Sequence, residues 1–132
     1  MTVTVWVDDW QMQCCGESFG PGDVVSWELI EADPEDYADL VGDEVAAGIG
    51  FREEHHGQGA GDAPVALEVV GVDEVHCRYE VSSRGGGVSE PVPGTTEFVP
   101  VERADGWAKT RAGVRFAGYL VTARPVGEGP GR

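Results

Sequence analysis

Residues 65–81 have the sequence VALEVVGVDEVHCRYEV, which is rich in valine and other side chains that favour extended strands. The one glycine in this run, Gly71, predicts a β-bulge or a kink partway along a long strand. In the second half of the run, alternate side chains belong to opposite faces. This alternation predicts that Cys77 points into the core and that His76 points outward.

Other alternating segments separated by glycine and proline predict further strands on both sides of this run, at residues 2–7, 24–30, 97–102 and 114–123. Pro100 lacks a backbone N–H, so its strand is expected at a sheet edge or at a bulge. The fold prediction is therefore mainly β, a small barrel of five or six strands that is SH3-like or OB-like. The alternative is an open α+β sheet with one helix packed on it.

One helical segment interrupts the strands, at about residues 34–56. Asp33 and Pro34 are typical of a helix start, because an aspartate side chain can accept from exposed amides and proline suits the first helical position. His55 and His56, followed by glycine, are typical of a helix end. We expect a single domain over residues 1–124 and a disordered tail over residues 125–132.

The chain is strongly acidic. Its 132 residues carry 24 acidic and 9 basic side chains, for a formal net charge of −15. Residues 1–51 hold twelve of the acidic side chains and no lysine or arginine. This charge disfavours nucleic-acid binding and favours association with a basic protein or a cationic small molecule. The alternative interpretation is an acidic surface that serves only solubility.

The sequence also predicts a cellular location. It has no apolar run of about 18 residues that could cross a bilayer, and its N-terminus lacks the features of a secretory signal. Its three cysteines are an odd number, and two of them are adjacent, which does not suit a disulfide framework. We therefore expect a cytoplasmic protein that does not bind membranes.

The opening motif W-V-D-D-W-Q-M-Q-C-C-G, which starts at Trp6, is long and unusual. With Glu54–Gly57, Asp105–Trp107 and Phe116–Val121, it resembles a family of small actinobacterial proteins that is known as a domain of unknown function. The resemblance covers residues 3–123. Ser18 follows Glu17 where the family pattern has proline, a change that loosens the turn. The resemblance implies a stand-alone bacterial domain, and it supplies no catalytic residues.

A metal site is one functional hypothesis. Cys14, Cys15, His55 and His56 carry the thiolate and imidazole groups that zinc selects. Adjacent side chains diverge on a strand or a helix, so at most one member of each pair is expected to ligate. The alternative interpretation is that one cysteine fills the core and the histidines cap a helix.

The same vicinal cysteines support a redox hypothesis. A disulfide between Cys14 and Cys15 closes a strained ring that is easily reduced, which suits a sensor. However, no lysine or arginine lies near them in sequence, and the neighbouring acidic residues disfavour a thiolate.

The leading hypothesis is a non-enzymatic binding or regulatory module. Trp27 shares a face with neighbouring apolar residues and is expected in the core. The binding residues predicted on the acidic surface are Asp8, Asp9, Trp10 and Trp107, because carboxylates and exposed aromatic rings both attract cations. No phosphate loop or nucleophile elbow accompanies them, which disfavours an enzyme. Exposed strand edges also make a homodimer possible.

Overall fold

The computed structural model of the chain describes residues 2–8, 18–53, 64–81, 89–92, 94–106 and 113–126. The strands are β1 (Val3–Asp8), β2 (Val24–Trp27), β3 (Leu29–Glu31), β4 (Phe51–Glu53), β5 (Val65–Val81), β6 (Ser89–Pro91), β7 (Glu97–Pro100) and β8 (Val114–Pro125). The helical elements are η1 (Pro34–Asp36), α2 (Ala38–Val41) and α3 (Asp43–Gly48). The prediction of a mainly β fold is confirmed.

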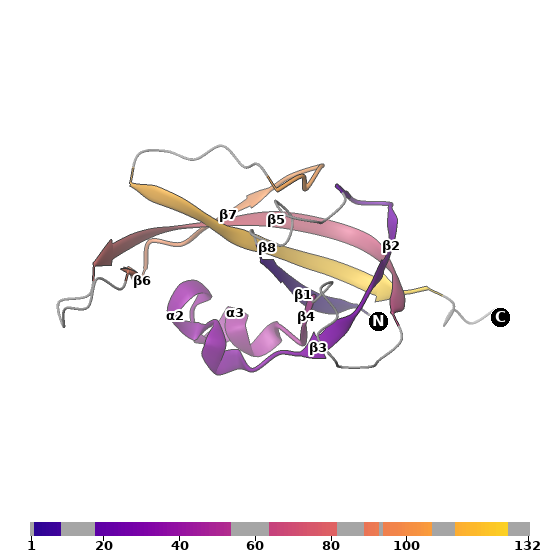
Figure 1. The fold of residues 1–132 in the computed structure, drawn as a ribbon, viewed down its shortest axis with the longest axis horizontal. Coiled ribbons are helices and arrows are strands. Elements are labelled where there is room, and N and C mark those ends of the chain that lie inside the picture. The colour runs from indigo at the N-terminus through magenta and orange to yellow at the C-terminus, as the bar shows by residue number, and fades with distance from the viewer. Residues whose placement is uncertain are drawn as a thin grey trace.

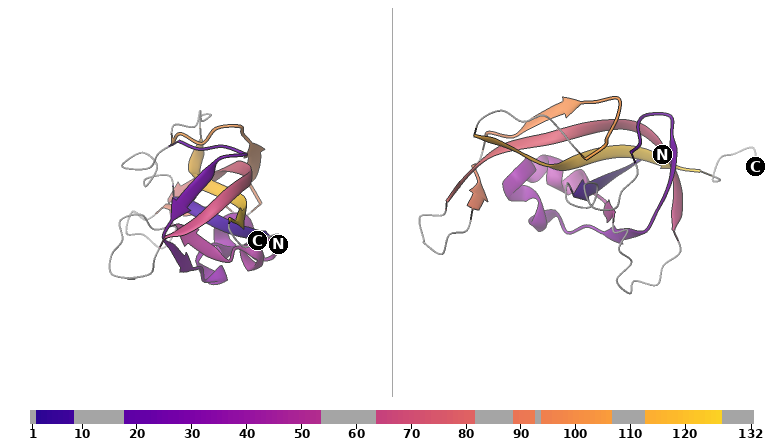
Figure 2. Two further views of the ribbon diagram at one scale, coloured as in Figure 1. Left: turned by 90° about the vertical axis from the view of Figure 1, so that its right-hand side faces the viewer. Right: turned by 45° about the horizontal axis from the view of Figure 1, so that its top comes forward.

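The sheet is a nearly closed barrel of 6 strands in the order β2-β5-β8-β1-β4-β3 (Figure 1). Strand β1 pairs antiparallel with β8 and parallel with β4. The two strands at the ends of the order, β2 and β3, are separated in sequence only by Glu28, so one segment of chain borders both edges. Figure 2 shows the curled sheet, with this segment at its edges. The predicted barrel is confirmed, and β6 and β7 pair with β5 outside it.

Side chains that alternate along the strands separate two cores. The barrel interior contains Val5 and Val7 of β1 and Tyr119 of β8, and Trp27 packs against it as predicted. The opposite face of the same strands packs against the helical layer, where Trp6 contacts the Tyr37 ring with centroids 5.4 Å apart. Both faces of the central strands are therefore covered.

The helical layer, residues 34–48, lies against one face of the sheet (Figure 1). It begins as the sequence predicts, because Asp33 Oδ1 accepts a 3.0 Å hydrogen bond from the Glu35 amide and Pro34 occupies the first turn. In the part of the chain that the structure describes, no helix is long and apolar enough to span a membrane.

The prediction that the helical segment continues to residue 56 is wrong. Helix α3 ends at Gly48, and residues 51–53 form β4, which runs parallel to β1 with Phe51 beside Val5. The Gly50 amide already donates to the Thr4 carbonyl over 3.0 Å. This pairing completes the barrel, and it outweighs a helical pattern that the two glycines weaken.

The predicted irregularity at Gly71 is confirmed, because the pairing of β5 with β8 shifts between Val69 and Gly71. Cys77 is buried as predicted, with 0% exposure. The prediction that His76 points outward is wrong, since it is only 6% exposed and its ring lies 5.6 Å from that of Phe116. The prediction from alternating side chains assumes that one face of the strand is exposed to solvent. Here both faces of β5 are covered.

Strand β7 confirms the prediction for Pro100. Among the described strands β7 pairs only with β5, so it lies at an edge. The Val101 amide donates to the Val72 carbonyl, which means that the nitrogen of Pro100 faces away from β5 and no ladder bond is lost.

At the C-terminus, β8 continues to Pro125, one residue past the expected domain boundary, and residues 127–132 of the predicted tail lie outside the described residues.

Candidate functional site

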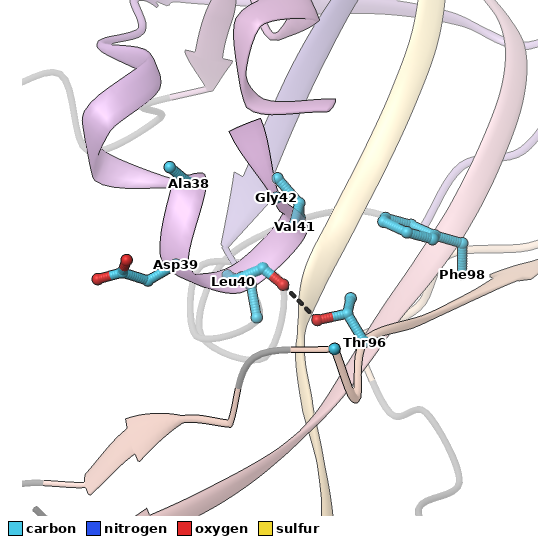
Figure 3. Close-up of a pocket in the computed structure, with 8 residues that line it drawn as sticks. Ala38, Asp39, Leu40, Val41, Gly42, Thr96 and Phe98 are labelled. Carbon is cyan, nitrogen blue, oxygen red and sulfur yellow. Dashed lines mark hydrogen bonds between the residues drawn. The ribbon is translucent and has the colours of Figure 1, made fainter. Parts of the chain in front are cut away.

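Two pockets adjoin between the helical layer and the sheet, and Phe98 of β7 lines both. The first has a volume of about 300 Å³, and its lining includes Leu40 and Thr96 (Figure 3). The second has a volume of about 330 Å³, and its lining includes Val45 and Leu120. We call the two together the helix–sheet groove. Each pocket is within the size range that small ligands or single side chains occupy.

The walls of the helix–sheet groove are largely apolar. Phe98 is 39% exposed, although it lies opposite the fully buried Val75 of β5. Leu40, Val45 and Leu120 are half-buried at the margin of the helix-side core. These side chains leave an apolar surface uncovered, which is a common property of binding sites.

The charged groups of the helix–sheet groove are all carboxylates. Asp39 lines the pocket beside α2, and Glu44 and Asp73 line the pocket beside α3. Among the residues that the structure describes, none of these three carboxylates has an ion-pair partner, and no lysine, arginine or histidine lines either pocket. The groove therefore combines apolar walls with uncompensated negative charge.

The segment beside the groove adds to this charge. Every acidic side chain between residues 31 and 44 is exposed, and these are Glu31, Asp33, Glu35, Asp36, Asp39, Asp43 and Glu44. No cation lies within this segment or anywhere in residues 1–51. Because the segment forms the outer layer of the molecule, its carboxylates create a continuous negative field around one side of the groove.

A polar link holds the two walls of the groove together. The Thr96 hydroxyl donates to the Leu40 carbonyl near the end of α2 (Figure 3). Behind this link the buried Cys77 sulfur lies 3.4 Å from the hydroxyl oxygens of both Thr96 and Thr95. The link satisfies a carbonyl that α2 itself leaves without a partner.

Asp8 is the one predicted binding residue that the structure describes, and it does not line the groove. Its Oδ1 accepts a 2.7 Å hydrogen bond from the indole Nε1 of Trp6. Burial raises the pKa of Tyr37 to about 12, with the charge of Asp8 adding to the rise and that of Arg52 opposing it. Asp8 therefore has a structural role beside the helix-side core.

The other predicted site residues lie outside the described residues, and they are Asp9, Trp10, Trp107, Cys14, Cys15, His55 and His56. The described ends of the segments that hold the metal candidates are Asp8 of β1 and Glu53 of β4. Since β1 and β4 are parallel and paired, these ends lie at the same end of the barrel. Within the described part of the chain, no group of three or more potential metal ligands occurs.

Sequence reasoning missed a buried pair on β5. His76 Nε2 lies 2.9 Å from Glu74 Oε1, and the side chains are 7% and 15% exposed. Burial raises the pKa of the nearby Tyr119, whose hydroxyl accepts a 2.8 Å bond from the Gly106 amide. The spacing of two residues placed His76 and Glu74 on one face of a strand, and this signal was available in the sequence.

Fold and groove together define a class: a small, mainly β barrel domain with an acidic helical layer and an apolar groove beside it. The particular family follows from a comparison with family models. Residues 1–125 match the model described as "Family of unknown function (DUF6578)", so the chain belongs to this family. This match confirms the resemblance to a domain of unknown function that the sequence indicates. Searches of curated proteins and of solved structures gave no match.

Proposed function

We propose that this protein is a non-enzymatic binding module and that its helix–sheet groove holds a basic segment of another protein. The observation that carries the proposal is the lining of the groove, where Phe98 and its apolar neighbours lie among carboxylates without cationic partners. Apolar side chains of the bound segment would cover the exposed ring, and its lysines or arginines would pair with Asp39, Glu44 and Asp73.

The charge of the whole chain supports this proposal. A net charge of −15 attracts a cationic partner over long distances and raises the rate of encounter at low salt. The exposed carboxylates of residues 31–44 concentrate this field on the side of the molecule that holds the groove. An acidic surface that serves only solubility requires net charge. It does not require an uncovered aromatic ring beside that charge.

The polar groups of the groove suit binding better than catalysis. Its described lining has threonine hydroxyls from Thr4, Thr96 and Thr122, and it has no cysteine, serine, histidine or lysine. In the described lining none of the three carboxylates is hydrogen-bonded to one of these hydroxyls, and a hydroxyl that no base activates is a poor nucleophile. These groups are therefore expected to make hydrogen bonds to a bound chain.

A direct test uses a synthetic peptide of alternating lysine and leucine residues, titrated into the protein while its binding heat is measured. We expect Asp39→Asn/Glu44→Gln/Asp73→Asn to bind about tenfold more weakly, because each partly exposed ion pair contributes about 0.2–1 kcal/mol. The matched control is Glu80→Gln/Glu90→Gln/Glu102→Gln, which removes three exposed carboxylates that do not line the groove.

Equal weakening by both triple variants would show that the peptide responds to net charge alone, and it would contradict the proposed groove. Phe98→Ser separates the apolar contribution to binding from the ionic one, since it removes the apolar contact and leaves every charge in place.

Spermidine, a cation without apolar side chains, distinguishes a basic protein segment from a cationic small molecule as the ligand. Tight binding of spermidine with no preference for the peptide would replace the protein partner by a cationic small molecule.

A second candidate function is metal binding or thiol redox chemistry at Cys14, Cys15, His55 and His56. One structural observation favours it. Asp8 and Glu53 lie at the same end of the barrel, so the segments that contain these cysteines and histidines both start there. Sequence spacing alone leaves the two segments unrelated, whereas parallel pairing of β1 with β4 gives them a common starting point.

A further inference from the structure

One segment of this chain has the composition that the helix–sheet groove would bind. Residues 107–111 are Trp107-Ala108-Lys109-Thr110-Arg111, the only place where a tryptophan and two cationic side chains occur within five residues. The segment lies outside the described residues. The described cationic side chains nearest to this segment in the sequence are Arg103 and Arg115. Arg103 pairs with Asp23 at 2.9 Å, and Cζ of Arg115 lies 4.9 Å from the centroid of the Tyr79 ring.

The segment begins after Gly106, which lies on the barrel side of the sheet. The Gly106 amide donates to the hydroxyl of Tyr119, whose ring belongs to the barrel interior. The groove is on the opposite face of the sheet, where Leu120 borders the helical layer.

We propose that the helix–sheet groove of one copy binds residues 107–111 of a second copy of this chain. Lys109 and Arg111 pair with the carboxylates of the groove, and the Trp107 ring covers Phe98. This inference rests on the proposed function and names its partner. Because each copy has one groove and one cationic segment, two copies can exchange segments reciprocally and close as a two-fold dimer.

Charge complementarity is the physical basis of this assembly. The first 80 residues hold 19 acidic and 2 basic side chains, whereas the last 52 hold 5 acidic and 7 basic ones. A copy therefore presents a strongly negative part to the weakly positive part of its partner. Since the pairs lie at the surface, salt screens them, and the dimer is expected to dissociate as ionic strength rises.

Sedimentation velocity of the full chain tests the proposal. At low salt we expect the mass to rise with concentration from 14.0 kDa to twice that value, and to return to 14.0 kDa at high salt. Lys109→Glu/Arg111→Glu reverses the cationic segment, and Asp39→Lys/Glu44→Lys reverses the groove. Each variant alone is expected to stay monomeric. Asp39 and Glu44 are exposed, so reversing their charges leaves the buried cores unchanged.

Mixing the two variants gives the sharpest result. The reversed segment of one then meets the reversed groove of the other, and the unchanged segment and groove also match, so a dimer is expected to form again. The control Arg84→Glu/Arg132→Glu makes the same change in net charge as Lys109→Glu/Arg111→Glu, but elsewhere in the chain, and is expected to dimerise like the wild type. Circular dichroism confirms that each variant is folded.

A wild-type chain that stays at 14.0 kDa at every concentration and at low salt would overturn the proposal. The same conclusion would follow if the wild type dimerised but the mixed variants stayed monomeric. The lysine–leucine peptide distinguishes this failure from that of the proposed function. If that peptide binds the groove while the chain does not self-associate, the groove is a site for another basic protein.

Discussion

The indole Nε1 of Trp6 donates a 2.7 Å hydrogen bond to the Asp8 carboxylate two residues further along β1. Trp6 is 2% exposed and packs in the helix-side core, so this bond satisfies a buried donor at the edge of that core. Asp8 therefore takes part in an internal hydrogen bond, whereas the sequence analysis predicts it as a binding residue on the acidic surface. The helix–sheet groove instead takes its charge from residues that sequence reasoning did not select.

The Trp6–Asp8 hydrogen bond predicts different effects for two substitutions of Asp8. Asp8→Ala leaves the buried indole N–H without an acceptor and is expected to cost about 1–3 kcal/mol of unfolding free energy. Asp8→Asn keeps an acceptor oxygen and is expected to cost less than half of that. Urea unfolding followed by tryptophan fluorescence measures both. Equal losses in the two variants would mean that the charge of Asp8, and not its hydrogen bond, stabilises the fold.

Gly118 of β8 lies against the Trp6 ring. A Cβ atom at this position would be 2.6 Å from the Val7 carbonyl oxygen and 2.7 Å from the Trp6 ring carbon Cζ2. Gly118→Ala is therefore expected to destabilise the protein by about 1–3 kcal/mol and to shift the tryptophan emission. Gly71→Ala is the matched control, because a Cβ there meets no atom within 4 Å. The contact at Gly118 is unimportant if both variants melt at the same temperature.

Tyr37 predicts how stability depends on alkaline pH. Its pKa is raised by burial from 10.0 to about 12, so the folded chain holds the phenol proton more tightly than the unfolded chain does. The resulting stability is fully present below pH 10, and it is lost as the pH rises through about 12. Between these values we expect a loss on the order of 2 kcal/mol.

Tyr37→Phe tests this dependence, since it keeps the ring contact with Trp6 and removes the titrating group. Urea unfolding at several pH values between 9 and about 12 should show a shallower decline for Tyr37→Phe than for the wild type. The buried Tyr119, whose pKa is also raised, still contributes a decline in both proteins. Parallel curves for the two proteins would argue that Tyr37 ionises with an ordinary pKa.

The Thr96–Leu40 hydrogen bond predicts the reactivity of Cys77. Its sulfur is fully buried behind the Thr96 hydroxyl, so in a Cys14→Ser/Cys15→Ser background we expect slow reaction with a thiol reagent. Thr96→Val removes the bond to α2 and is expected to speed this reaction severalfold and to cost about 1 kcal/mol. Thr96→Ser keeps the hydroxyl and should behave like the parent. If Thr96→Val reacts no faster, the link does not hold the groove wall in place.

The metal hypothesis predicts that stoichiometric zinc is retained by the wild-type chain. Native mass spectrometry of protein purified without chelator should then show an added zinc mass that disappears on acid denaturation. Cys14→Ser/Cys15→Ser is expected to lose this mass, because thiolates are the stronger zinc ligands of the set. A bare polypeptide mass for the wild type would rule out a tightly bound metal, and slow oxidation of the cysteine pair would remain to be tested.

Local sequence patterns predicted every described strand except β4 and β6, and they predicted the start of the helical layer. Alternation at β1 and β8, the glycine at the β5 bulge, and Asp33 with Pro34 at η1 each express a preference of a few neighbouring residues, and the structure confirms them. Such preferences need no knowledge of distant parts of the chain. For the same reason the barrel itself was predictable, because many short strands without long helices leave few alternatives.

Tertiary structure alone decided which residues meet. Strand β4 forms because it can pair in parallel with β1. His76 is buried because the sheet is covered on both faces. Asp8 accepts a hydrogen bond from Trp6. The helix–sheet groove unites residues as distant in sequence as Leu40 and Phe98. These contacts depend on how the sheet curls and on what packs against it. Periodicity shows which side of a strand a residue occupies, and only the packed fold shows what lies opposite.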